Sequence, residues 1–132
     1  MISKAMQMKA RPIATEAQEQ TALFKWAEFN ARVIPELTLL FHIPNGGKRD
    51  VITASRLKAQ GVKSGVPDLF LPVPRGSYHG LFVEMKKIGG TISDKQGEWI
   101  PALAAQGYKT VVCQGWVEAA DMIKRYLNPL KA

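Results

Sequence analysis

An aspartate, a glutamate and a lysine interrupt two apolar segments of this chain. Asp68 opens the apolar run 69–71. Glu84 and Lys86 end the run that begins at Leu81. Burying an uncompensated charge in a sheet is costly, so charged residues in such strands are usually paired or bind metal. These three side chains predict a divalent-metal site that hydrolyses phosphodiester bonds.

Strand geometry predicts that the three groups converge. Side chains two residues apart in a strand share a face, so Glu84 and Lys86 project into one site. If the two runs pair as a hairpin, Asp68 lies beside the end of the other strand. Mg²⁺ or Mn²⁺ would then take oxygen ligands from Asp68, Glu84 and the Met85 carbonyl. Lys86 would orient or deprotonate the attacking water, or stabilise charge in the transition state. The alternative is a surface strand with an outward Glu–Lys ion pair, which leaves Asp68 unexplained.

The first predicted helix supplies two further candidates. Glu16 and Gln20 lie seven residues before Leu23 and Ala27, so they extend the same helical stripe toward the sheet. Glu16 is therefore a candidate catalytic acid and metal ligand, and Gln20 a candidate substrate contact. The alternative is that acids in a first helical turn only favour the helix macrodipole. Glu19 competes with Glu16 for the same role.

Positive charge is concentrated around the predicted site. The chain has 18 Lys and Arg against 11 Asp and Glu, a net charge of +7. Nine of the basic residues fall between positions 48 and 95, where only four acids oppose them. A polyanionic partner such as DNA or RNA would explain this, and a solvated basic surface is the alternative. The predicted phosphate contacts are Lys48, Arg49, Lys63 and Lys87.

Two further polar positions are candidate substrate contacts. Asn45 belongs to a turn, Pro44 to Gly47, whose backbone amides and following cations could approach a phosphate. A plain surface turn is equally consistent, and the spacing lacks the Walker pattern, so no nucleotide cofactor is expected. Gln96 could touch substrate from its helix, although its place in a capping box with Ser93 accounts for it.

Predicted helices and strands, which must position these residues, are interspersed along the chain. The pattern predicts helices over 15–33, 53–60 and 116–127, and strands over 38–43, 69–73, 81–86 and 108–113. Another helix starts at Ser93 and ends near Gly107, with a kink or a delayed start at Pro101. The order predicts an α/β fold with one mixed sheet flanked by helices. Residues 1–14 are expected to form a tail and 15–132 a single domain.

Composition limits the classes of protein that fit. No apolar run approaches the ~20 residues that cross a bilayer, so no membrane partner is expected. The basic N-terminus has no apolar segment behind it, which argues against a secretory signal. Cys113 is the single cysteine, which excludes an intrachain disulfide and favours a reducing cytoplasm.

Six ordered blocks of this sequence resemble the VRR-NUC domain, the virus-type replication-repair nucleases of the PD-(D/E)XK superfamily. The resemblance covers about residues 15–127. The blocks are Thr15–Gln18, Ile43–Gly47, Leu57–Gly61, Gly65–Leu69, Leu81–Lys86 and Ser93–Gln96.

The resemblance implies a restriction-endonuclease-like core of order αβββαβ. It also implies Mg²⁺ or Mn²⁺ as cofactor and structure-selective cleavage of branched DNA such as four-way junctions or flaps. Stand-alone members are typically phage-encoded homodimers, which for this chain would place it in the host cytoplasm. By motif, Asp68, Glu84 and Lys86 take the catalytic positions, Glu16 the helix acid and Gln96 the glutamine after the last catalytic strand. Gln20 matches a frequent Glu or Gln of the helix motif.

Two other interpretations stay open at this stage. A non-catalytic module of the same fold would bind nucleic acid without metal-dependent cleavage. A structural subunit would use the basic face to meet an acidic protein and would not bind DNA.

Overall fold

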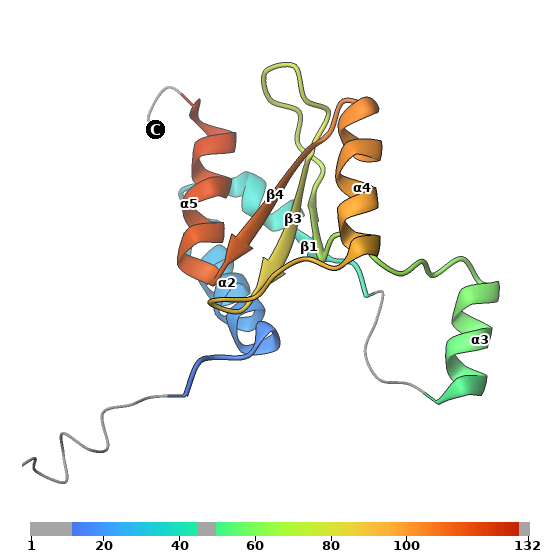
Figure 1. Ribbon diagram of the computed structural model, residues 1–132. Helices are drawn as coiled ribbons and strands as arrows, with labels where there is room; N and C mark the ends of the chain where they lie inside the picture. Colours follow the sequence, from blue (N-terminus) through green and yellow to red (C-terminus); the bar gives the residue numbers. More distant parts are fainter. Residues whose placement is uncertain (1–11, 45–49, 130–132) are drawn as a thin grey trace, which may run out of the picture.

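The computed structural model describes residues 12–44 and 50–129. Within these two ranges, four α-helices and a four-stranded mixed sheet form a layered α/β arrangement (Figure 1). Figure 1 shows α2 and α5 on one side of the sheet and α4 on the other, whereas α3 stands apart. None of the helices within the described residues is long and apolar enough to cross a membrane. The predicted fold class, a mixed sheet between helices, is confirmed at this level.

The sheet has the order β1-β2-β3-β4. β1 (Phe41–His42), β2 (Leu69–Leu71) and β3 (Leu81–Lys86) pair antiparallel as a meander. β4 (Lys109–Gln114) pairs parallel with the whole of β3. A parallel neighbour requires a crossover, and α4 (Asp94–Ala105) supplies it. The result leaves β3 as the central strand that carries two of the three predicted charges.

Alternation along the strands separates a core face from a second face. Leu81, Val83 and Met85 are fully buried against α2 (Glu16–Asn30) and α5 (Trp116–Leu127). The intervening residues of β3 point to the side of α4. α5 buries five residues along one side. They are Ala119, Ala120, Ile123, Tyr126 and Leu127.

Local signals set the helix starts. Thr15 and Ser93 each form a capping box with the glutamine three residues later, as the sequence predicts for Ser93. α3 (Val51–Ala59) begins two residues before its predicted start, because the Asp50 side chain accepts a hydrogen bond from the Thr53 amide. α4 runs through Pro101 from Asp94, so the delayed start predicted there is wrong.

The predicted strand over 38–43 is the main error in the elements. A 3₁₀ helix, η1 (Pro35–Leu39), includes its first two residues, and only Phe41 and His42 pair as β1. Pro35 favours the helix start because its fixed φ suits a first turn and its missing amide is not needed there. Leu37 and Leu40 are buried by this turn, whereas both residues of β1 are exposed.

Candidate active site

The β2–β3 hairpin brings Asp68 beside Glu84. Leu69 lies opposite Val83 in the antiparallel register, so the preceding Asp68 faces Glu84. β3 continues for three residues beyond the last partner that β2 provides. The Asp68 carboxylate replaces the missing strand, since its Oδ2 accepts a hydrogen bond from the Met85 amide at 2.8 Å. Asp68 is therefore fixed by the backbone of the strand that carries Glu84.

The Met85 carbonyl points to the same edge of β3 as Asp68. Within an extended strand the N–H and C=O of one residue point to the same side, as the paired exchange in antiparallel ladders requires. The Met85 amide faces Asp68, and the Lys86 carbonyl faces the other way, to the Gly115 amide at 2.9 Å. A main-chain oxygen therefore joins the two carboxylates at this edge.

Lys86 lies between acids from two different elements. Its Nζ is 3.7 Å from Glu84 Oε1 and 3.6 Å from Glu16 Oε1. The lysine side chain is almost fully buried, whereas Glu16 is half exposed in the first turn of α2. The buried ammonium is thus compensated by two carboxylates, as a charge in a sheet requires.

Gln96 holds the other side of Glu84. Its Nε2 donates to Glu84 Oε1 at 2.7 Å. The same side chain completes the capping box of α4, because Gln96 Oε1 accepts from the Ser93 amide at 2.8 Å. One residue therefore both starts the helix and orients the Glu84 carboxylate, whereas its predicted contact with substrate stays a prediction.

The environment of Glu84 disfavours its charged form. Glu84 is only 2 % exposed, and burial is the main reason that its pKa is raised to about 8. The charge of the adjacent Asp68 raises the pKa further, while Lys86 opposes the rise. Two carboxylates so close together repel each other, and a cation between them would relieve that repulsion.

The arrangement fits a hard divalent cation. Within residues 12–44 and 50–129, no three His, Cys, Asp or Glu side chains converge as a metal-binding group. The donors at this edge are instead two carboxylates and one carbonyl, and Glu16 is paired with Lys86. Mg²⁺ usually binds one or two carboxylates and fills its remaining positions with waters and substrate phosphate. The donor set therefore suits a cation that shares its coordination with a substrate.

The remaining predicted substrate contacts either lie near this edge of β3 or fall outside the described residues. Lys63 precedes the Asp68 segment and Lys87 directly follows β3, and both are exposed. Gln20 is half-buried one turn beyond Glu16 on α2. Asn45, Lys48 and Arg49 lie outside the described residues.

Two structural supports of the site were not predicted. Glu19, rather than Glu16 or Gln20, extends the buried stripe of α2, and its Oε1 accepts from the Trp116 amide at 3.1 Å. It thereby caps α5, whose N-cap Gly115 has no side chain to do so. The spacing of Glu19 four residues before Leu23 was the available signal.

The second support holds the segment that leads to Asp68. Gly65 has φ +86°, and a Cβ there would lie 2.6 Å from the Lys95 carbonyl carbon of α4. Trp99 of α4 is half-buried and donates its Nε1 proton to the Ser64 carbonyl at 3.0 Å. The segment is thus clamped onto α4, the helix that also presents Gln96.

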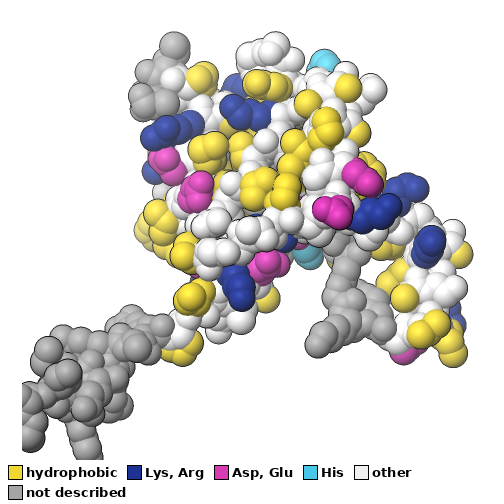
Figure 2. All heavy atoms as spheres, viewed as in Figure 1, with side chains coloured by type: hydrophobic (Ala, Val, Ile, Leu, Met, Phe, Trp, Pro, Cys, Tyr) yellow, Lys and Arg dark blue, Asp and Glu magenta, His cyan; other side chains and the backbone are white. Residues whose placement is uncertain are grey.

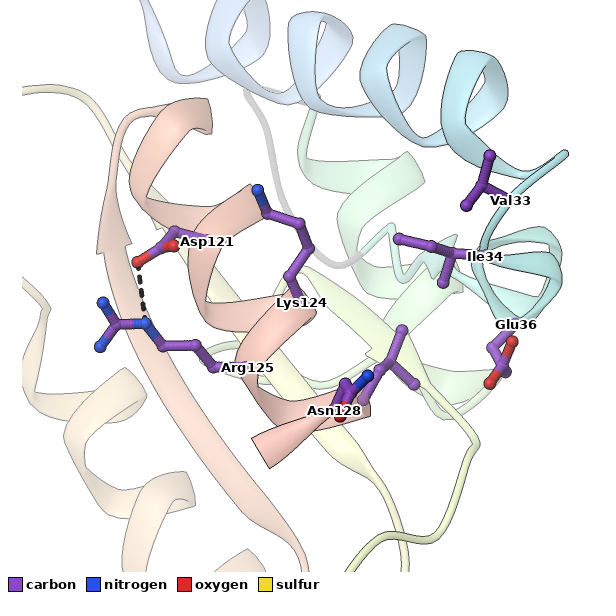
Figure 3. Close-up of a pocket in the computed structure, with 8 residues that line it drawn as sticks. Val33, Ile34, Glu36, Asp121, Lys124, Arg125 and Asn128 are labelled. Atoms are coloured by element: carbon purple, nitrogen blue, oxygen red, sulfur yellow. Dashed lines mark ion pairs between the residues drawn. The ribbon is translucent and has the colours of Figure 1, made fainter. Parts of the chain in front are cut away.

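A separate surface pocket of about 500 Å³ lies between the segment that follows α2 and the C-terminal half of α5 (Figure 3). Its charged lining includes Asp121 and Arg125, which pair with each other at 3.1 Å. None of the residues described above at the edge of β3 lines it. This pocket therefore belongs to a different part of the molecule.

The site thus consists of two acids and a lysine at the end of β3 in an α/β fold. Residues 10–116 match the model of the VRR-NUC domain. The chain also resembles a solved structure described as a VRR_NUC domain protein, with 33 % identity and a TM-score of 0.73 over 88 % of this chain and 90 % of that one. The protein belongs to the VRR-NUC family. No curated protein matches the sequence.

Proposed function

We propose that this protein is a Mg²⁺- or Mn²⁺-dependent DNA endonuclease that hydrolyses phosphodiester bonds in branched DNA. Its fold would be a PD-(D/E)XK core of order αβββαβ, with residues 15–132 forming one domain. The observation that carries the proposal is the convergence of Asp68, Glu84 and Lys86 at one edge of β3. A structural ion pair alone would not require a second carboxylate at this edge.

The proposed roles follow from the contacts. Asp68, Glu84 and the Met85 carbonyl would hold the cation, which supplies charge neutralisation at the scissile phosphate and a more acidic bound water. Gln96 keeps the Glu84 carboxylate turned toward this edge. Lys86 would stabilise the negative charge that develops on the phosphate, because its ammonium is already fixed in a buried position. Glu16 would position that ammonium from α2, and its role as a further ligand stays a prediction.

Charge supports DNA as the polyanionic partner. The net charge is +7, and the exposed Lys63 and Lys87 flank the segments that carry Asp68 and Lys86. Figure 2 shows Lys and Arg side chains over α3 and beside the start of α4. Such cations would bind phosphates without regard to sequence, leaving the shape of the DNA to select the substrate.

Exposed apolar surface supports the proposed homodimer. Val51 and Ile52 of α3 are 85 % and 72 % exposed, and α3 has no buried residue. Figure 2 also shows hydrophobic side chains gathered between α4 and α5, over the edge strand β4. A symmetric dimer would bring two cutting sites to a symmetric junction.

A cleavage assay tests the function directly. Purified protein is incubated with labelled duplex, flap and four-way-junction DNA, in EDTA and in Mg²⁺ or Mn²⁺, and the products are resolved on a gel. The proposal predicts cleavage only with the cation and preferentially of branched DNA. Binding without cleavage under every condition would favour a non-catalytic module, and the absence of binding would favour a structural subunit.

A further inference from the structure

A continuous row of aromatic rings crosses the sheet on the face that carries the acids. Phe41 of β1 contacts Phe70 of β2 edge to face at 5.9 Å between ring centroids. Phe70 stacks on Phe82 of β3 at 4.4 Å, with 22° between the ring planes. Tyr108, just before β4, meets Phe70 and Phe82 at 5.9 and 5.5 Å. The row therefore runs from β1 across β2 and β3 to the residue that precedes β4.

The row is continuous with the candidate active site. Phe70 pairs with Phe82, and the rung two residues further along the same face is that of Asp68 and Glu84. Two residues of a strand advance about 7 Å, which is about two nucleotide steps along one DNA strand. A nucleotide whose phosphate lies at the acids would thus have neighbouring bases within reach of the rings.

The rings also lack a full cover. α4 packs along β4 and makes no comparable contact with β1 or β2 within the described residues. α4 itself buries no residue, and Phe70, Phe82 and Tyr108 are only partly buried. Phe41, on the outer strand, is 47 % exposed. A sheet face that were simply part of the core would be closed by a helix.

We infer that this aromatic row is a docking surface on which unpaired nucleic-acid bases stack beside the cleaved phosphate. Aromatic side chains next to a cation-rich surface are the combination that binds single strands, because every base offers a π-face. Bases inside a continuous duplex already stack on each other, so only a single strand, a flap or a branch point can supply them. The inference rests on the proposed nuclease function and specifies the substrate as DNA with unpaired bases next to the cut.

Two oligonucleotides separate base stacking from phosphate binding. A labelled thymidine oligonucleotide of about ten nucleotides and an abasic oligonucleotide of the same length carry the same phosphates. Binding is measured by fluorescence anisotropy in EDTA, so that no cleavage intervenes. Wild-type protein is expected to bind the thymidine strand at least about tenfold more tightly than the abasic strand.

A pair of variants locates the effect. Phe41→Leu keeps apolar area at the outer strand but removes the ring, and is expected to weaken thymidine-strand binding by between about fivefold and a hundredfold. Its binding to the abasic strand should not change. Phe29→Leu is the matched control, because Phe29 is 79 % exposed on α2, which packs on the other face of the sheet. It should bind both strands as the wild type does.

Three results would overturn the inference. Wild-type protein could bind the two strands equally, a comparison that requires no variant to fold. Phe41→Leu could bind the thymidine strand as tightly as the wild type. Light scattering could show that Phe41→Leu separates a dimer while DNA binding is unchanged, which would assign the rings to a second copy of this chain. The assay does not depend on turnover, so a failed cleavage assay would remove the nuclease proposal and leave this result to be judged separately.

Discussion

At the level of single residues, Asp68 accepts a hydrogen bond from the backbone of β3 and also repels the Glu84 carboxylate. It satisfies the Met85 amide and at the same time raises the pKa of Glu84. Sites that concentrate like charges for function commonly do so at a cost in stability. Replacing the charge while keeping the hydrogen-bond acceptor should separate these two effects.

Asp68→Asn is expected to reduce metal-dependent cleavage by about a hundredfold or more, because it removes one of two carboxylates that would hold the cation. The melting temperature in EDTA should be unchanged or raised by a few degrees, since repulsion with Glu84 falls. Asp121→Asn is the control, because Asp121 forms a surface ion pair on α5. A folded Asp68→Asn protein that cleaves at the wild-type rate would contradict the assignment.

Two acidic residues of α2, Glu16 and Glu19, have different roles. Glu19 is buried and caps α5, whereas Glu16 is half exposed and contacts Lys86. Glu19→Ala should lower the free energy of unfolding by about 1–2 kcal/mol, because the Trp116 amide loses its acceptor. Glu16→Ala should change it by less than about 0.5 kcal/mol and yet slow cleavage, since Lys86 loses one partner. Urea unfolding and initial cleavage rates measure both. The reverse pattern would mean that the functional acid is Glu19.

The proximity of Asp68, Glu84 and Lys86 could be predicted from the sequence because it depends on local geometry. A hairpin and the alternation of a strand suffice to place Glu84 and Lys86 on the face of Asp68. Glu19 was considered only as a competitor of Glu16, and its capping contact was not predicted because its partner is almost a hundred positions away, at the start of α5. Such a contact depends on how two helices pack together, which the spacing within one helix does not specify.

At the level of elements, α4 contacts both the Glu84 side chain and the segment that leads to Asp68. Gln96 in its first turn binds Glu84, and its next turns clamp the segment that leads to Asp68. Gly65 permits this clamp because any side chain would collide with the backbone of Lys95. The distance between the two carboxylates therefore depends on a glycine three residues before one of them.

A pair of glycine variants tests this clamp. Both Gly61 and Gly65 have positive φ, but a Cβ at Gly61 would meet nothing within 4 Å. Gly61→Ala should therefore cost only the backbone strain, about 1 kcal/mol. Gly65→Ala should cost more and should also slow cleavage, because the backbone must move away from α4. Urea unfolding and cleavage assays give the comparison, and equal effects of the two variants would show that the close approach is unimportant.

The elements were predictable where a cap or a long apolar pattern marked them. The helices α2, α4 and α5 and the strand β3 begin within a residue or two of their predicted starts. The end of η1 was assigned to a strand because the run over 38–43 resembles a buried strand, whereas Pro35 and the burial of Leu37 favour a tight turn. The parallel pairing of β3 with β4 could not be predicted from either strand alone, since it depends on the path of α4.

At the level of the whole molecule, part of the apolar surface stays exposed to solvent in a single chain. The core lies between the sheet and the pair α2 and α5, and among the described residues α4 covers the other face mainly along β4. α3 makes no extended contact with another element of the described chain. Burial of apolar area is the main favourable term in association, so exposed Val51 and Ile52 weaken the case for a monomer.

A homodimer is therefore expected at micromolar concentration. Light scattering coupled to gel filtration should give twice the chain mass of 14.6 kDa. Ile52→Ser should shift the mass toward one chain if α3 takes part in the interface, because a buried polar group replaces an apolar one. Val117→Ser is the matched control, since Val117 is an exposed aliphatic residue on α5.

A wild-type protein that remains at 14.6 kDa would remove the dimer and with it the expectation that one assembly makes both cuts in a junction. Each chain would then cut independently, and nicked intermediates would accumulate before the second strand is cleaved.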